Sequence, residues 1–277
     1  MGAITIPDMV EIVKMHGFVP KFVDISQDDF QPNINQINEL INDKVKMILV
    51  TQLFGQKFDL HKLAKVAADH GIFLVEDCAQ AFDGSYEGSP FADATLFSFG
   101  PIKKHTCLSG AKVTVKDQKL RTLLQNTLSS LPNHPNIWFM KRLFKYSALK
   151  LICKPPFYGM LNIATSLLGV SIDQLLYHWS RCHTGRKLEN KLNMQLPTAA
   201  QSFLNMRLSS IRSADQKKLY RPWVKTMLFP KPEVMVKKYK RKGIPASSQL
   251  GSIRCLAPNG QCSSAESLLK RIVFRRS

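Results

Sequence analysis

Short apolar runs alternate with helical patterns over the first 130 residues of the chain. Three runs have strand length and are almost continuously apolar, as buried parallel strands are; they cover residues 20–25, 45–51 and 72–76. Between them a 3.6-residue period predicts amphipathic helices over 7–16, 34–41 and 60–70. A further strand over 111–116 and a helix over 117–131 follow. This alternation predicts an α/β fold with a mostly parallel sheet and flanking helices.

The periodicity weakens beyond residue 131. Residues 132–195 are rich in basic, aromatic and proline residues without a clean period, and the next amphipathic helix is predicted over 198–211. Residues 237–277 are basic, serine-rich and poor in apolar runs, so we expect this tail to be only partly ordered. We therefore expect a large α/β domain over 1–131, a basic and aromatic connection over 132–195, and a small irregular or α+β part over 196–277.

The two halves of the chain differ sharply in charge. The 277-residue chain carries a net charge of +19, but residues 1–100 hold 14 acidic against 7 basic side chains, a net of −7. Residues 101–277 therefore hold 6 against 32, a net of +26. A field this positive attracts phosphates of nucleic acid, of anionic lipid or of a diphosphate-bearing small molecule. The basic segments are expected first of all to be solvated helix faces. No nucleic-acid fold signature accompanies them, so we expect a nucleotide-linked ligand or a membrane surface before nucleic acid.

Composition excludes several classes of protein. With 44% hydrophobic and 21% charged residues, the chain matches globular proteins and neither a disordered tail nor a membrane bundle. The six cysteines form no CxxC pair and the histidines lack metal-like spacing, so we expect reduced thiols, a cytoplasmic location and no metal site. The start lacks the features of a signal peptide. The uncharged run 155–172 is diluted by proline, glycine and polar residues, which favours an interfacial or buried segment over a membrane span.

An acid and a lysine follow two neighbouring predicted strands. Asp77 comes directly after the strand at 72–76, and Lys103 follows 26 residues later, after an FSF segment. Ligands of open α/β sheets bind beyond the carboxyl ends of the strands. Alone, either residue is more often a turn or cap residue. Together they are what a pyridoxal phosphate enzyme needs: an amine that forms a Schiff base with the aldehyde, and a carboxylate that keeps the pyridine nitrogen protonated.

The segments around these two residues carry a family resemblance. The run LVEDCAQAFDGSYEG at 74–88, followed by DATLFSFGPIKKHTCLSGAKVTV at 93–115, resembles the DegT/DnrJ/StrS family of sugar aminotransferases. The resemblance extends from about Ala3 to Asp117 and fades afterwards. It implies the fold type I architecture of pyridoxal phosphate-dependent transferases, with pyridoxal 5'-phosphate as the cofactor.

The resemblance assigns a role to four residues. It implies Asp77 as the partner of the pyridinium nitrogen, Gln80 as a residue against the cofactor ring near its hydroxyl, and Ser98 as a phosphate ligand. Lys103 is implied as the Schiff-base lysine, which also moves the proton as general base and acid. The neighbouring Lys104 has the wrong offset from Ser98.

The implied activity is transfer of an amino group from an amino acid, such as glutamate, to a keto-sugar that can be nucleotide-linked. Family members are commonly homodimers with sites at the subunit interface, so a homodimer is expected.

The chain departs from the family at its start. Relatives carry, before the segment equivalent to 3–17, a portion whose helix N-terminus cups the cofactor phosphate. Ile6 stands where relatives often place an aromatic over the ring, and the tail at 272–277 stops where a relative would continue. We therefore expect an N-terminally truncated chain, with activity in doubt because bonds to the phosphate are lost. The alternative function is that of a catalytically impaired remnant acting as a binding or interaction module.

Overall fold

The structure is a computed structural model. It describes residues 1–101, 103–152, 193–214, 224–241, 246–248 and 253–276. The uncharged run 155–172 and the basic stretch 181–191 lie outside these residues. Within the described ranges, no helix combines the length and apolar character that crossing a membrane requires.

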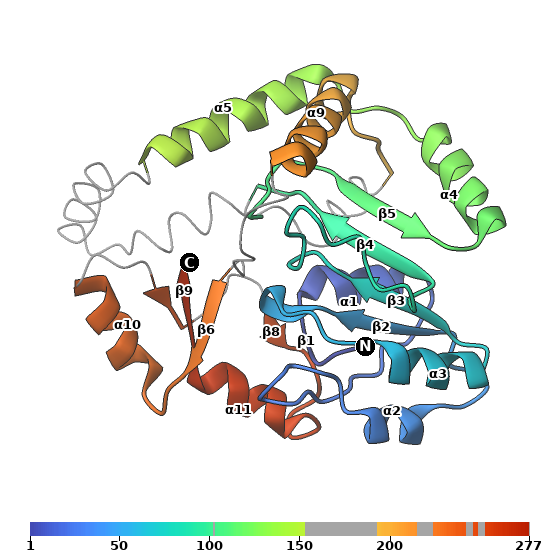
Figure 1. Cartoon of the computed structure of the whole chain (residues 1–277), viewed down its shortest axis with the longest axis vertical. Helices are drawn as coiled ribbons and strands as arrows, with labels where there is room; N and C mark the ends of the chain where they lie inside the picture. The colour runs from blue at the N-terminus through green and yellow to red at the C-terminus, as the bar shows by residue number, and fades with distance from the viewer. Residues whose placement is uncertain (102, 153–192, 215–223, 242–245, 249–252, 277) are drawn as a thin grey trace.

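A four-stranded sheet forms the centre of the N-terminal part of the chain (Figure 1). Its strands, in spatial order, are β2 (Met47–Thr51), β3 (Phe73–Asp77), β4 (Ala94–Ser98) and β5 (Ala111–Val115). The first three are parallel and β5 runs antiparallel to β4. The fold is α/β with a mostly parallel sheet, as predicted, and the strands predicted over 45–51, 72–76 and 111–116 are confirmed.

Four helices form where the periodicity predicts them. They are α1 (Pro7–Met15), α2 (Ile34–Leu40), α3 (His61–Asp69) and α4 (Gln118–Ser130). The apolar side of α3, with Leu63 and Ala67, packs in one core cluster with Ile48, Val50 and Leu74 of the strands. Because side chains alternate along a strand, Ile48 and Val50 of β2 lie on the same face of the sheet.

The strand predicted over 20–25 is wrong. Val23 makes an isolated parallel bridge with Gly2, and Ile25 makes an isolated antiparallel bridge with Pro32. The physical reason is local pairing, because the backbone of Val23 exchanges hydrogen bonds with Met1 and Ala3, each 2.9 Å long. The apolar run is buried, as its composition demands, without joining the four-stranded sheet.

Two long helices lie beyond β5. They are α5 (Asn136–Ile152) and α9 (Thr198–Ala214), and the rings of Phe139 and Phe203 join them with centroids 5.8 Å apart (Figure 1). The sequence pattern predicts α9 but not α5, because α5 presents apolar residues to two sides. One side holds the buried Phe139, and the other exposes residues such as Ile137, Met140 and Phe144.

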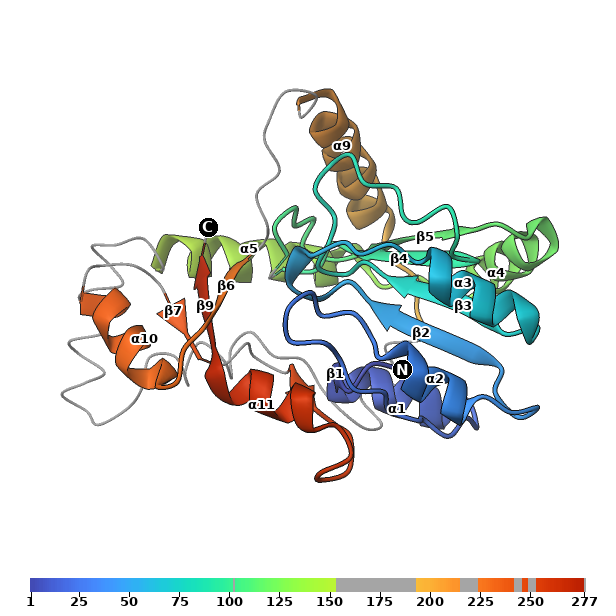
Figure 2. The same cartoon turned by 60° about the horizontal axis from the view of Figure 1, so that its bottom comes forward.

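The C-terminal part builds a second, smaller sheet with helices. Its elements are β6 (Val224–Leu228), α10 (Pro232–Arg241), β7 (Ala246–Ser247), β8 (Arg254–Cys255), α11 (Ser263–Arg271) and β9 (Ile272–Arg276). Strands β6, β9 and β7 form an antiparallel sheet in that order, at the opposite end of the molecule from the large sheet (Figure 2). Much of the serine-rich tail is therefore secondary structure, which its composition did not predict.

The first and last segments of the chain share one core. Strand β1 (Ile4–Thr5) pairs with β8, and the short 3-10 helix η1 (Leu53–Gly55) packs with α11 and β9 in the same apolar cluster. The Asp24 carboxylate accepts hydrogen bonds from the backbone N–H groups of Ser264 and Ala265, at 2.9 and 2.8 Å. It therefore caps the first turn of α11 from 240 residues away, a place where N–H groups lack partners within the helix.

Candidate active site

Asp77 is the last residue of β3 and lies at the carboxyl edge of the large sheet. It is in register with Thr51 of β2 and Leu96 of β4. The chain leaves the sheet here, with the Gln52 N–H donating to the Asp77 carbonyl at 2.9 Å and the Cys78 N–H donating to the Leu96 carbonyl at 2.8 Å. The backbone at Asp77 is thus fixed by both neighbouring strands.

The Asp77 carboxylate is buried with few donors. The Ala79 N–H donates to Oδ1 at 2.9 Å, and the Thr51 hydroxyl lies 3.5 Å from Oδ2. Burial raises the pKa of the Asp77 carboxyl above its ordinary value, against the opposing effects of the Ala79 N–H, the Lys103 charge and the Thr51 hydroxyl. The carboxylate therefore gains from any cation placed beside it.

Lys103 lies in the loop that connects β4 to β5, over residues 99–110. The Lys103 N–H donates to the Gly100 carbonyl at 3.1 Å, and the base of the loop is closed by the Phe99 N–H to Gly110 carbonyl bond at 2.9 Å. Burial lowers the pKa of the Lys103 amine, and the Asp77 carboxylate opposes this effect. The amine and the carboxylate are therefore close enough to influence each other's ionisation.

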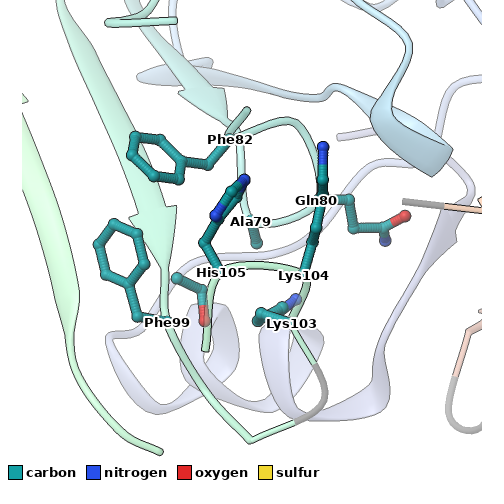
Figure 3. Close-up of a pocket in the computed structure, with 8 residues that line it drawn as sticks. Ala79, Gln80, Phe82, Phe99, Lys103, Lys104 and His105 are labelled. Atoms are coloured by element: carbon teal, nitrogen blue, oxygen red, sulfur yellow. The ribbon is translucent and has the colours of Figure 1, made fainter. Parts of the chain in front are cut away.

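A small cavity collects three of the four predicted site residues. Gln80, Ser98 and Lys103 line it, and Figure 3 shows the side chains of Lys103, Lys104 and Gln80 on one side and the rings of Phe82, Phe99 and His105 on the other. Its volume is about 10 Å³. That is room for one water molecule, far below the roughly 300 Å³ of an ordinary ligand pocket.

Gln80 is oriented by the backbone of the neighbouring loop. The Phe54 N–H donates to Gln80 Oε1 at 2.8 Å, from a residue with a φ of 58° in η1. Because the amide oxygen is the accepting end, the nitrogen is the end of Gln80 that can donate to a further acceptor.

Other residues singled out in the sequence have less specific surroundings. Lys104 is exposed and lines the same cavity, but the charge that acts on Asp77 is that of Lys103. His105 lies edge-on to Phe82 with centroids 5.5 Å apart. Ile6 precedes α1, outside the set of described residues that line the cavity. Nowhere in the described ranges do three His, Cys, Asp or Glu side chains gather as a metal site would require.

Sequence reasoning missed the part played by Glu76. This carboxylate is fully buried and accepts hydrogen bonds from Gln52 Nε2 at 2.8 Å and the Tyr86 hydroxyl at 2.7 Å. The Ser89 N–H and the Thr95 hydroxyl bind its second oxygen, at 2.8 and 3.1 Å. Four donors satisfy the charge, so Glu76 ties β3 to β4 and to the 86–89 segment behind Asp77. The sequence signal for this role was the position of an acidic residue inside an otherwise apolar strand.

The chain resembles known proteins in sequence and in structure. The model of the DegT/DnrJ/EryC1/StrS aminotransferase family matches residues 1–134. The GDP-perosamine synthase of Escherichia coli O157:H7 is 32% identical over 114 residues, 40% of this chain and 31% of that protein. The lipopolysaccharide biosynthesis protein RfbH of Salmonella typhimurium is 27% identical over 123 residues, 43% of this chain and 28% of that protein. The matched segment thus spans less than a third of these curated relatives.

The structural likeness extends over the whole chain. An aminotransferase of the same family name from Brucella abortus superposes with a TM-score of 0.65 at 16% identity, covering 99% of this chain and 72% of that one. DesV of S. venezuelae, solved with a ketimine intermediate, gives a TM-score of 0.66 at 16% identity, covering 100% of this chain and 71% of that one. At these identities the likeness concerns the fold, which is that of fold type I aminotransferases.

Proposed function

Because residues 1–134 match the model of the DegT/DnrJ/EryC1/StrS aminotransferase family, we propose that this chain binds pyridoxal 5'-phosphate and moves an amino group from an amino acid to a keto-sugar. The observation that carries the proposal is the pairing of a buried carboxylate, Asp77, with the partly buried amine of Lys103 at the carboxyl edge of the sheet. Catalysis of amino transfer needs these two groups on either side of one ring.

The donor set at this edge fits the cofactor. Asp77 would hold the ring nitrogen, Lys103 the aldehyde carbon, the Gln80 amide nitrogen the ring hydroxyl, and Ser98 the phosphate. When bound, the protonated ring supplies an electron sink for the reacting carbon. The cavity is smaller than the cofactor, so binding requires the long side chains that line it, those of Lys103 and Lys104, to move outward.

The surroundings of Lys103 suit both of its proposed roles. Burial favours the neutral amine, and a neutral amine is the form that attacks a carbonyl carbon and accepts a proton. The Asp77 carboxylate would be stabilised as the ionised form by a cationic ring, since burial alone works against its charge. The two groups therefore complement opposite ends of the cofactor.

Covalent trapping on Lys103 tests the proposal. The purified chain is incubated with pyridoxal phosphate, reduced with borohydride, and digested for mass spectrometry, alongside Lys103→Ala and the matched control Lys104→Ala. We expect the visible absorption band and the reduced adduct in the wild type and in Lys104→Ala, with at least about a tenfold loss in Lys103→Ala. An adduct on Lys104, or equal labelling of all three proteins, would contradict the assignment.

The same experiment tests the amino donor. If glutamate is the donor, it leaves as 2-oxoglutarate and no aldehyde would remain for borohydride to link to Lys103. Adding glutamate before reduction is therefore expected to lower the labelling of Lys103. Unchanged labelling would leave cofactor binding in place and exclude glutamate as the donor.

The alternative is a remnant of the family that acts as a binding or interaction module. The cavity of about 10 Å³ favours this alternative, because a site that never opens cannot admit the cofactor. Absence of the band and of the adduct in the wild type, with a folded protein by circular dichroism, would select it.

The remaining parts of the proposal concern partners and location. We propose a nucleotide-linked sugar as substrate, because the net charge of +26 over residues 101–277 favours a diphosphate. A homodimer is proposed because α4 has no buried residue and exposes Leu123, Leu124 and Leu128. A cytoplasmic location is proposed because the cysteines of the described ranges, Cys78, Cys107, Cys255 and Cys262, are free thiols. The basic half also suits contact with an anionic membrane surface.

A further inference from the structure

The loop that carries Lys103 is bent by a residue in an unfavourable conformation. Leu108 has a φ of 65°, in the left-handed region that favours glycine. Its N–H donates to the Thr106 hydroxyl at 3.0 Å, and the preceding Cys107 N–H donates to the Phe99 carbonyl at 2.9 Å. A leucine keeps this conformation only when its surroundings hold it there.

Arg142 of α5 supplies that hold. Its Nε and Nη2 atoms both donate to the Leu108 carbonyl, at 3.1 and 2.9 Å. A guanidinium donates two hydrogen bonds in a fixed geometry, so the pair sets both the position and the direction of the carbonyl.

The guanidinium is itself held in place by aromatic rings. It lies over the ring of Trp138 at 4.7 Å and near that of Tyr146 at 5.6 Å, both measured to the ring centroid. The ring of Trp138 is itself stacked on His134, with ring centroids 4.5 Å apart and planes 4° from parallel. Helix α5 packs on α9 through Phe139 and Phe203. Helix α9 in turn packs against Gly110 at the end of the loop, where an added Cβ would lie 3.0 Å from the Leu204 side chain.

We infer that Arg142 is a positioning residue for Lys103, which fixes the lysine loop by clamping the Leu108 carbonyl. This inference rests on the proposed function for its consequence, because the position of the amine matters when it must meet the cofactor aldehyde. It does not rest on the family resemblance, since Arg142 lies beyond residues 1–134. Losing the clamp releases Leu108 from its strained turn, and the loop from Lys103 to Gly110 then loses its single conformation.

Hydrogen exchange of the full chain without cofactor tests the clamp directly. The variants are Arg142→Gln, which keeps a polar end on a shorter side chain and loses the charged fork, and Lys141→Gln as the control at an exposed position of the same helix. We expect peptides covering 99–110 to exchange at least tenfold faster in Arg142→Gln, with β3 and β4 unchanged. Unchanged exchange in the loop, or equally faster exchange throughout the sheet, would overturn the inference.

Covalent trapping with a rescue variant tests the consequence for Lys103. At limiting pyridoxal phosphate we expect Arg142→Gln to lower the borohydride-trapped fraction about fivefold, and Lys141→Gln to leave it unchanged. Adding Leu108→Gly to Arg142→Gln relieves the backbone strain and is expected to restore part of the trapping. No loss in Arg142→Gln would overturn the positioning role. If the wild type itself is not trapped, the proposed function fails, while the exchange experiment still decides whether the clamp exists.

Discussion

Two adjacent carboxylates at the end of β3 have opposite environments. Glu76 and Asp77 point to opposite faces because successive side chains of a strand alternate. Glu76 meets four donors, and Asp77 meets one backbone N–H, a distant hydroxyl and the Lys103 charge. The first carboxylate is therefore suited to holding the structure, and the second to responding to a ligand.

The surroundings of Asp77 predict a pH-dependent effect of Asp77→Asn. Because burial raises the native pKa of this carboxyl above 3.8, the folded state binds its proton more tightly than the unfolded state. The wild type loses stability as the pH rises from 3.8 through the native pKa, whereas asparagine does not ionise. We expect the stability of Asp77→Asn relative to wild type to rise across this window, measured by urea unfolding at a series of pH values.

Asp83→Asn is the control with the opposite sign. Burial works against the charge of Asp83, but the Lys57 ion pair and the N–H groups of Tyr86 and Ser85 lower its pKa to about 2. The stability that this carboxylate contributes is complete above 3.8 and is lost as the pH falls through about 2. Asp83→Asn should therefore lose relative stability as the pH rises. If the relative stabilities of Asp77→Asn and Asp83→Asn changed in the same direction with pH, burial would not raise the pKa of Asp77.

Sequence reasoning at the residue scale reached the groups that carry recognisable chemistry. Asp77, Gln80, Ser98 and Lys103 follow from a motif of fixed spacing, and the structure brings them to one edge of the sheet. Arg142 could not be found this way. Its partner is a backbone carbonyl, which has no sequence signature.

At the scale of elements, Gly88 marks where the 84–92 connection crosses β4. Its φ is 102°, and a Cβ at this position would lie 2.5 Å from the Thr95 hydroxyl, which is bonded to Glu76. Only glycine allows this approach without moving the network that holds β3 and β4 together.

Gly88→Ala is therefore expected to destabilise the protein by about 3 kcal/mol, from backbone strain and displacement of Thr95. Gly260→Ala is the matched control, since Gly260 has a φ of 80° but no heavy atom within 4 Å of its Cβ position. It should show the strain alone, about 1 kcal/mol. Equal losses of free energy of unfolding in the two variants would show that the Thr95 contact does not matter.

The regular elements were predictable where the sequence pattern is clear. Strands β2 and β3 follow from apolar runs of strand length, and helices α1, α2 and α3 from a 3.6-residue period. The strand predicted over 20–25 is wrong because an apolar run indicates burial and not the element that forms. This segment is buried by pairing with residues 1–3 and by packing on C-terminal residues. Helix α5 was not predicted, because apolar residues on two sides of the helix remove the 3.6-residue period from the sequence pattern.

At the scale of the whole molecule, exposed leucines are concentrated on α4 beside the edge strand β5. Leu123 is 61% and Leu128 is 54% exposed, and Val113 of β5 is 54% exposed. An apolar surface of this kind favours association of copies. The proposed homodimer would cover it.

Light scattering of the purified chain is expected to give twice the chain mass of 31.3 kDa. Replacing Leu124 and Leu128 by glutamate places two charges in the proposed interface, and we expect at least a tenfold weaker dimer. Val19→Glu, at an exposed apolar position near α1, is the control and should leave the mass unchanged. A monomeric wild type, or a double variant that dimerises normally, would exclude this interface.

The shared core of the two chain ends has a consequence for synthesis. Ala3, Ile4 and Val10 share an apolar cluster with Leu268, Ile272 and Phe274, so this cluster is completed only after residues 262–274 have been synthesised. Phe22, Phe30 and Phe54 belong to the same cluster. Until those residues are available, the N-terminal members of the cluster expose apolar surface, and exposed apolar surface is what chaperones recognise.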